Sequence, residues 1–323
     1  MTVYYYSAIS RRTTATAAYY PPLYVTTFSS SLRSSHIPPT YITNNPSHTH
    51  FTHALPLIAA GVSGGFNAPV SGVFFALETL SFNTTSLSNL FLTSISSSLV
   101  THAILNDDLA FTTPELFVAN EGLTELPLYV ILGVLSGLMS YALTLATETL
   151  TEFKENLPPR SLLAVSAPIL AGLITGLIGF YHPRVLFFGY DTLNSLLTDT
   201  LPLPLLLTLL FLKVLTTSTA TASGLVGGQL APSLFIGATL GGAYHSILTT
   251  VLEPSLLSSA PTYALIGAAS VLSSKFKAPV FGGVLLFELT RDYNVLFPLL
   301  GSAWVGSAVY EAVRERREGN EGR

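Results

Sequence analysis

From about residue 52 onward, the chain is a succession of apolar runs separated by short polar stretches that contain Pro or Gly. Several runs are shorter than the roughly 20 residues that a helix needs to cross a bilayer. Short, interrupted helices at membrane depth are tolerated where they face protein or a water-filled cavity. The pattern predicts an all-α, polytopic membrane protein with broken helices around a transport site near the midplane. The predicted helices are 52–65, 69–82, 86–105, 126–149, 161–181, 202–219, 230–251, 261–274, 278–290 and 294–313.

One pair of short helices, joined by a turn, occurs twice in the sequence. The stretch FNAPVSGVFFALETL begins at Phe66, and FKAPVFGGVLLFELT begins at Phe276. A shift of 210 positions aligns 52–78 with 262–288 without a gap, and it superimposes Glu78 on Glu288. We interpret this as an internal repeat of a helix–turn–helix unit. Weak internal symmetry of this kind is typical of transporters and channels.

Composition supports a membrane protein and excludes several other classes. Hydrophobic residues make up 49% of the chain and charged residues 10%, whereas a water-soluble domain carries about a quarter charged residues. The net charge of −4 comes with no basic stripe, so nucleic acid is not an expected partner. The chain has no cysteine. Its histidines lack metal-ligand spacing and its serines lack a base partner. We therefore predict no metal, no cofactor and no enzyme.

Residues 1–51 are rich in Ser, Thr, Tyr and Pro and contain no acid, the first acidic residue being Glu78. This composition predicts disorder. An organelle transit peptide, which would place the protein in a chloroplast or other organelle membrane, and an uninformative leader are both open interpretations.

Charge in the loops gives an orientation. Positive charges in 150–160 and in the charged tail 314–323 favour the cytoplasmic or stromal side, and the acidic segment 107–125 favours the opposite side.

The run KVLTTSTATASGLVGGQLAPSLFIGATLGG, residues 213–242, carries the candidate chemistry. Glycines before a helix let the backbone approach a ligand closely. The first amides of that helix have no internal acceptor, and the helix dipole favours an anion beside them. Neutral dipoles would hold chloride without trapping it, as conduction requires. The alternative is that the glycines serve tight helix packing and that Pro232 is an ordinary early-helix residue.

This run resembles the CLC family of chloride channels and chloride/proton exchangers. Gly227, Gly228 and Pro232 match the family motif G-G-x-F-x-P, with Leu230 at the usual Phe. FNAPVSGVFFALETL resembles a second family segment, and GFYHPRVLFFGYDTLNSLL at 179–197 a third. The resemblance implies a homodimeric membrane protein with inverted repeats, and an anion seat formed by the amides of Gly228, Gln229, Leu230 and Ala231.

The resemblance also implies a division of the chain and some missing parts. Residues 52–313 would form the CLC-like transmembrane domain, with 52–106 a remnant of the first repeat and 126–313 the second. The family motifs G-S-G-I-P and G-x-x-G-P are not in the sequence. We therefore expect that this chain alone does not conduct. A non-conducting CLC-derived membrane partner or remnant is the alternative function.

Four further residues follow from the resemblance. Exchangers carry Glu-Glu where this chain has Glu78-Thr79; threonine has no titratable group in the physiological range, which favours passive, channel-like conduction over chloride/proton antiport. Glu78 and Glu288 are interpreted as structural acids that bond backbone amides, with proton relay as the alternative. Tyr310 is a candidate pore hydroxyl, or an interface anchor.

The chain has no room for the nucleotide-responsive CBS domains of many relatives, so we expect no regulation by ATP through them.

Overall fold

The computed structural model describes residues 48–79, 87–105, 125–158, 162–186, 190–198, 201–253 and 256–321. Every element within these ranges is a helix. In chain order they are α3 (His48–Phe66), α4 (Pro69–Thr79), α5 (Leu87–Leu105), α6 (Leu126–Glu155), α7 (Leu162–Tyr181), η3 (Pro183–Val185), α8 (Tyr190–Thr198), α9 (Leu203–Ser223), α10 (Leu230–Val251), α11 (Ala260–Phe276), α12 (Pro279–Thr290), η5 (Tyr293–Val295) and α13 (Leu296–Glu321).

The apolar runs predicted the long helices closely, and the differences lie at polar ends. Helix α6 continues to Glu155 and α13 to Glu321, so most of the predicted tail 314–323 is helical. Arg314 bonds Glu318 one turn further along α13, and pairs at this spacing support a helix without an apolar face. The short helix α8 was not predicted because its nine residues mix Leu with Asp, Asn and Ser. Of the predicted leader, 48–51 belong to α3, and 1–47 lie outside the described residues.

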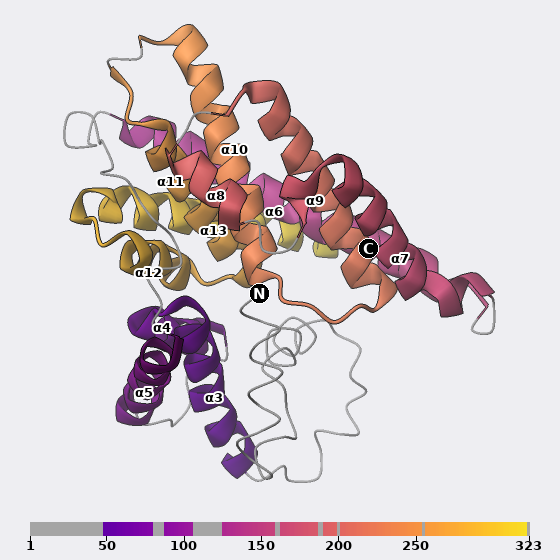
Figure 1. Cartoon of the computed structure of the whole chain (residues 1–323), viewed down its shortest axis with the longest axis horizontal. Coiled ribbons are helices and arrows are strands. Elements are labelled where there is room, and N and C mark those ends of the chain that lie inside the picture. The colour runs from indigo at the N-terminus through magenta and orange to yellow at the C-terminus, as the bar shows by residue number, and fades with distance from the viewer. Residues whose placement is uncertain are drawn as a thin grey trace.

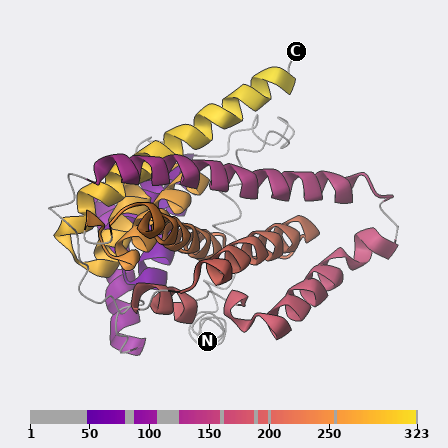
Figure 2. The same cartoon turned by 90° about the horizontal axis from the view of Figure 1, so that it is seen from above.

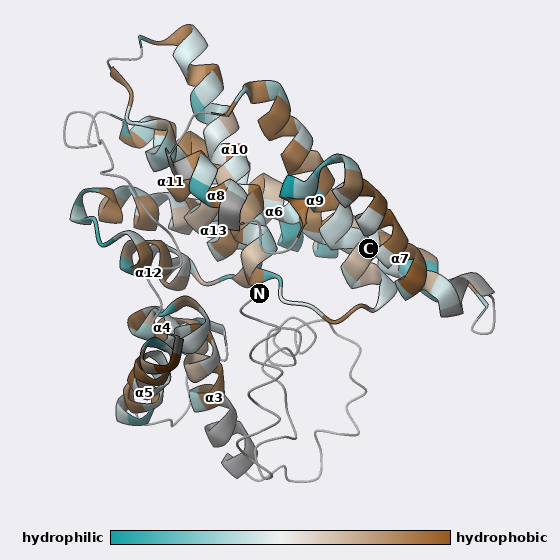
Figure 3. Ribbon diagram, viewed as in Figure 1, coloured by the Kyte–Doolittle hydropathy of each residue, from teal (hydrophilic) through white to brown (hydrophobic). Residues whose placement is uncertain are grey.

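The helices form two groups joined through α4 and α12 (Figure 1). Helices α3, α4 and α5 pack on one another, and α6 to α13 form the larger group. Helix α13 projects beyond the rest to the C-terminus, and α7 folds back from the end of α6 to lie along α9 (Figure 2). By length and composition, four helices within the described residues can cross a membrane: 126–155, 203–223, 230–251 and 293–320. Figure 3 shows apolar residues on the outward faces of α5 and α7.

Glycines bring α10 and α11 into backbone contact. A Cβ on Gly237 would lie 2.4 Å from the carbonyl oxygen of Gly267, and one on Gly241 would lie 2.1 Å from that of Tyr263. Close backbone approach through small residues is a common way for helices to associate in membranes. The second repeat therefore centres on a helix, α11, that is buried from Thr262 to Ser274.

The two repeat units share their turn as well as their helices. Asn67 and Lys277, which are 210 positions apart, both adopt positive φ, 53° and 55°. In each unit the following alanine donates its N–H back to a serine carbonyl, Ala68 to Ser63 at 3.2 Å and Ala278 to Ser273 at 3.0 Å. A proline then begins the next helix, as its fixed φ favours. The structure therefore contains two copies of a broken-helix unit, α3–α4 and α11–α12, that share the same turn geometry.

Candidate anion-binding site

The predicted seat lies at the connection between α9 and α10. Helix α9 ends in Gly224, whose φ of 95° is the left-handed conformation that glycine adopts without strain. The next four residues, 225–228, are exposed, and α10 begins at Leu230. The N–H of Ser233 donates to the carbonyl of Gln229 at 3.1 Å, closing the first turn. The amides of Gln229, Leu230 and Ala231 precede that bond, and Pro232 has no N–H to offer.

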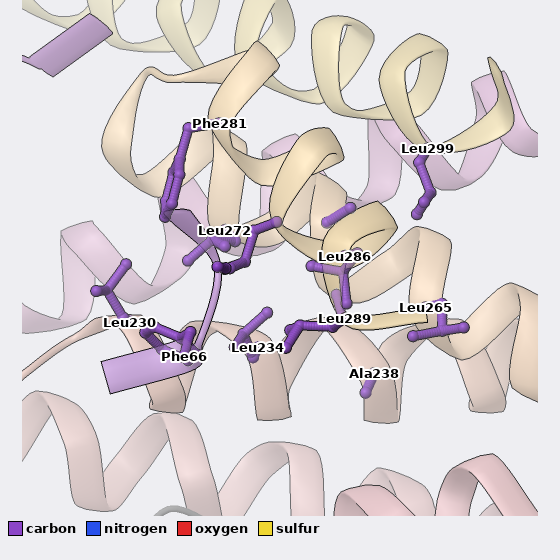
Figure 4. Close-up of a cluster of buried hydrophobic side chains, with 14 of the residues drawn as sticks. Phe66, Leu230, Leu234, Ala238, Leu265, Leu272, Phe281, Leu286, Leu289 and Leu299 are labelled. Carbon is purple, nitrogen blue, oxygen red and sulfur yellow. The ribbon is translucent and has the colours of Figure 1, made fainter. Parts of the chain in front are cut away.

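The side chains of this turn leave one side open. A Cβ on Gly227 or Gly228 would meet no heavy atom within 4 Å. By contrast, the Leu230 side chain is 7% exposed and points into the core cluster with Phe66, the last residue of α3 (Figure 4). The start of α10 therefore lies where the second repeat meets the first, with apolar side chains on one side and an exposed glycine turn on the other.

Two lysines donate hydrogen bonds to backbone carbonyl oxygens near this connection. Lys154, at the end of α6, donates from Nζ to the carbonyl of Ser223 at 2.8 Å, where α9 presents its negative end. Lys213 is 4% exposed, donates to the carbonyl of Val185 at 2.8 Å and lies 4.8 Å from the centre of the Phe235 ring. Lys213 therefore ties α9 to η3 and α10. The sequence pattern included Lys213 but gave no partner for it, because Val185 is 28 residues away.

The two repeated glutamates exchange helix caps. The Glu78 carboxylate accepts the N–H groups of Val280 at 3.0 Å and Phe281 at 2.7 Å, at the start of α12. The Glu288 carboxylate accepts those of Val70 at 2.9 Å and Ser71 at 2.7 Å, at the start of α4, together with the Ser71 hydroxyl. Each acid thus reaches the helix start of the other repeat, so α4 and α12 are antiparallel. Both acids were expected to bond backbone amides, and in the structure these amides belong to the opposite repeat.

The remaining predicted residues lie in separate places. The Thr79 hydroxyl donates to the carbonyl of Phe75 in its own helix at 2.6 Å. Tyr310 is 2% exposed, and its hydroxyl lies 3.3 Å from that of Thr144 on α6 and 3.5 Å from the guanidinium of Arg314. These contacts hold Tyr310 in the packing of α6 against α13, and none of its recorded contacts within the described residues is with the start of α10.

Sequence analysis missed a buried acid. Glu125 precedes α6 and is 2% exposed. Its carboxylate accepts the hydroxyl of Tyr129 at 2.5 Å, that of Tyr263 at 3.1 Å and the N–H of Ser258 at 2.6 Å. These groups fix the start of α6 to the segment that leads into α11. An acid directly before an apolar helix, with Tyr129 four residues further on, is the one signal for it in the sequence. The other two partners, Ser258 and Tyr263, lie more than 100 residues away and give none.

These features define a polytopic membrane protein built from two antiparallel, related units, with an exposed glycine turn before the start of α10. The family model described as voltage gated chloride channel matches residues 56–311. The chain belongs to this family, the CLC proteins.

Some known relatives are named as chloride channels and others as proton/chloride exchange transporters. Chloride channel protein CLC-e of Arabidopsis thaliana is 35% identical over 85% of this chain and 42% of its own length. Chloride channel protein CLC-f of the same plant is 35% identical over 78% of this chain and 34% of its own length. The H(+)/Cl(−) exchange transporter ClcA of Vibrio cholerae is 29% identical over 76% and 53%. The chain thus spans about half, or less, of the length of these relatives.

Solved structures share the fold. A slow cyanobacterial Cl−/H+ antiporter superimposes with a TM-score of 0.71 at 23% identity, covering 81% of this chain and 61% of that one. A CLC-type fluoride/proton antiporter gives a TM-score of 0.66 at 20% identity, covering 81% and 63%. Both are similar to this chain in fold.

Proposed function

We propose that this protein takes part in the transport of chloride or another small anion across a membrane, and that the amides at the start of α10 seat the anion. The observation that carries the proposal is the exposed glycine turn followed by the amides of Gln229, Leu230 and Ala231 at the junction of the two repeats. Membership of the CLC family supports it, as do relatives named for chloride. We also propose a homodimer, as the family resemblance implies, in an organelle membrane, as the acid-poor, Ser-rich composition of residues 1–51 suggests.

The local charges fit an anion that comes and goes. The positive end of the α10 dipole is equivalent to about half an elementary charge, which attracts a halide without a full countercharge beside it. The carbonyl groups at the end of α9, which precede the start of α10 by a few residues, would repel the same ion. The ammonium of Lys154, 2.8 Å from the carbonyl oxygen of Ser223, offsets that repulsion. The arrangement meets the requirement that binding be strong enough for entry and weak enough for release.

Removing one amide tests the seat. Ala231→Pro deletes a single N–H in the first turn of α10, where proline is tolerated, and the side chain changes little in size. We expect chloride affinity to fall about tenfold, the equivalent of about 1.4 kcal/mol, because hydrogen bonds to charged groups contribute about that much or more. The measurement is chloride titration of the purified protein by calorimetry. Ala231→Ser keeps the N–H and should bind as the wild type does. Equal affinity in both variants, or no chloride binding at all, contradicts the seat.

We propose passive, channel-like transport because Thr79 replaces the second acid of the exchangers and its hydroxyl is committed to the carbonyl of Phe75. In reconstituted vesicles in which chloride flux is detected, a chloride gradient should drive no proton uptake, measured with a pH-sensitive dye during chloride efflux. Proton uptake against its gradient would instead assign the protein to the antiporters. Absence of chloride flux in vesicles that do hold the folded protein would favour the second candidate function, a non-conducting CLC-derived membrane partner.

A further inference from the structure

Charged side chains gather where α6, α11 and α13 meet, and they include one cation more than acids. Lys275 of α11 is that additional cation, and the charges of Glu148 and Arg314 both act on it. Within the part of the chain that the structure describes, no acid lies within salt-bridge distance of Lys275. The salt bridges of the group are Lys277–Glu311 at 3.8 Å, Arg314–Glu318 at 2.8 Å and Arg317–Glu148 at 3.1 Å.

The ammonium of Lys275 is bound to a hydroxyl and not to a carboxylate. Its Nζ donates to Oγ1 of Thr144 on α6 at 2.9 Å. Thr144 donates its own proton to the carbonyl of Ser140 at 3.0 Å, and its oxygen lies 3.3 Å from the hydroxyl of Tyr310. An ammonium has three N–H donors, so Lys275 keeps donors for a further acceptor beside Thr144. A charge inside a membrane protein is costly and ordinarily pairs with an opposite charge.

The packing of α10 on α11 gives the depth of Lys275. A Cβ on Gly237 would lie 2.6 Å from Cα of Ala268, and one on Gly241 would lie 2.9 Å from Cα of Ala264. The two helices are therefore antiparallel, and each step back along α10 corresponds to a step forward along α11. Two turns from the first pair, Lys275 lies level with the first residue of α10. Its ammonium is turned toward α6, so it is separate from the amides of the proposed seat.

We propose that Lys275 binds a small inorganic anion between α6, α11 and α13, and that this anion supplies the negative charge the group lacks. We call this the Lys275 site. Lys275 is half-buried, and Tyr310, whose hydroxyl shares Thr144 with it, is 2% exposed. These surroundings, at the depth of the start of α10, suit a small ion and not a lipid headgroup. The choice of chloride as the ion rests on the proposed function, whereas the site itself does not use the amides of α10.

Anion binding can be measured without transport, because a ligand that binds only the folded protein raises its resistance to unfolding. The full-length protein is unfolded with a denaturing detergent at fixed ionic strength, while gluconate is replaced stepwise by chloride. We expect the midpoint of unfolding to rise with chloride in the wild type. In Lys275→Met the rise should fall by about half, since one of two sites is lost. In gluconate alone, Lys275→Met should resist unfolding at least as well as the wild type, because it removes a charge that has no acid partner.

Two variants control for charge and position. Lys275→Arg keeps the charge and should keep most of the rise. Lys277→Met makes the same substitution two residues further on, at a lysine that is paired with Glu311, and should leave the rise as in the wild type.

The Lys275 site and the proposed seat fail in different ways. If Ala231→Pro leaves the rise unchanged while Lys275→Met lowers it, the seat is wrong and the Lys275 site is supported. The Lys275 site is overturned if chloride raises the midpoint as much in Lys275→Met as in the wild type, or if Lys277→Met lowers the rise equally. It is also overturned if Lys275→Met lowers the midpoint by the same amount at every chloride concentration, as loss of the bond to Thr144 alone would do.

Discussion

Replacing Glu288 with alanine is expected to lower the free energy of unfolding by about 3 kcal/mol. The carboxylate accepts two backbone N–H groups at the start of α4 and the hydroxyl of Ser71. Without it, these donors lose their acceptor in a membrane setting, where few other partners are at hand. Because α4 and Glu288 belong to different repeats, the loss should loosen the contact between α4 and α12.

The symmetry supplies a graded comparison. Glu78 accepts two N–H groups at the start of α12 and no hydroxyl, so Glu78→Ala should cost less, about 2 kcal/mol. Ser71→Ala removes the additional donor alone and should account for about 1 kcal/mol. Unfolding is measured by titration with a denaturing detergent, followed by helical circular dichroism.

A control separates capping from the loss of any acid. Glu318 pairs with Arg314 at 2.8 Å but is 61% exposed, so Glu318→Ala should cost less than about 1 kcal/mol. If Glu288→Ala lowered the free energy of unfolding no more than Glu318→Ala does, the exchanged caps would not hold the two repeats together. The same result would return Glu288 to the alternative of a proton-relay role.

The exchanged caps illustrate which part of this fold the sequence predicts. Apolar runs and the proline turns give the helices, because burial in a bilayer demands long apolar segments and proline cannot continue a helix. The shift of 210 residues pairs Glu78 with Glu288 but cannot say which repeat each acid caps. That choice depends on the antiparallel packing of α4 on α12, where Phe75 meets Phe281 with ring centres 4.6 Å apart, and packing between distant segments leaves no local pattern.

The proposed anion seat shows the same division between what the sequence predicts and what distant packing decides. Glycine spacing and Pro232 locate the start of α10 to the residue, since helix starts have local signatures. The placement of Leu230 against Phe66 and of Lys154 on the last carbonyl of α9 depends on contacts across 164 and 69 positions. Tyr310 was selected as a lone late tyrosine, and the structure puts its hydroxyl beside Thr144.

Replacing Glu125 with alanine is expected to cost about 3–5 kcal/mol in the free energy of unfolding, because three buried donors lose their acceptor at about 1–3 kcal/mol each. Here the partners remain: the hydroxyls of Tyr129 and Tyr263 and the N–H of Ser258 would be left buried without their acceptor. Tyr129→Phe removes one of the three donors and should cost about 1 kcal/mol. Glu125→Gln keeps an acceptor oxygen and should fall between the two.

The position of the damage distinguishes this site from the caps. Glu125 fixes the start of α6 to the segment before α11, so its loss should raise amide hydrogen exchange at residues 256–263 while leaving α4 protected. Loss of Glu288 should do the reverse, raising exchange in 69–73. If both variants raised exchange equally in both places, the second repeat and the α4–α12 contact would unfold as one unit. The hydrogen bonds of Glu125 and those of Glu288 would then belong to one cooperative core, and would not stabilise separate parts of the structure.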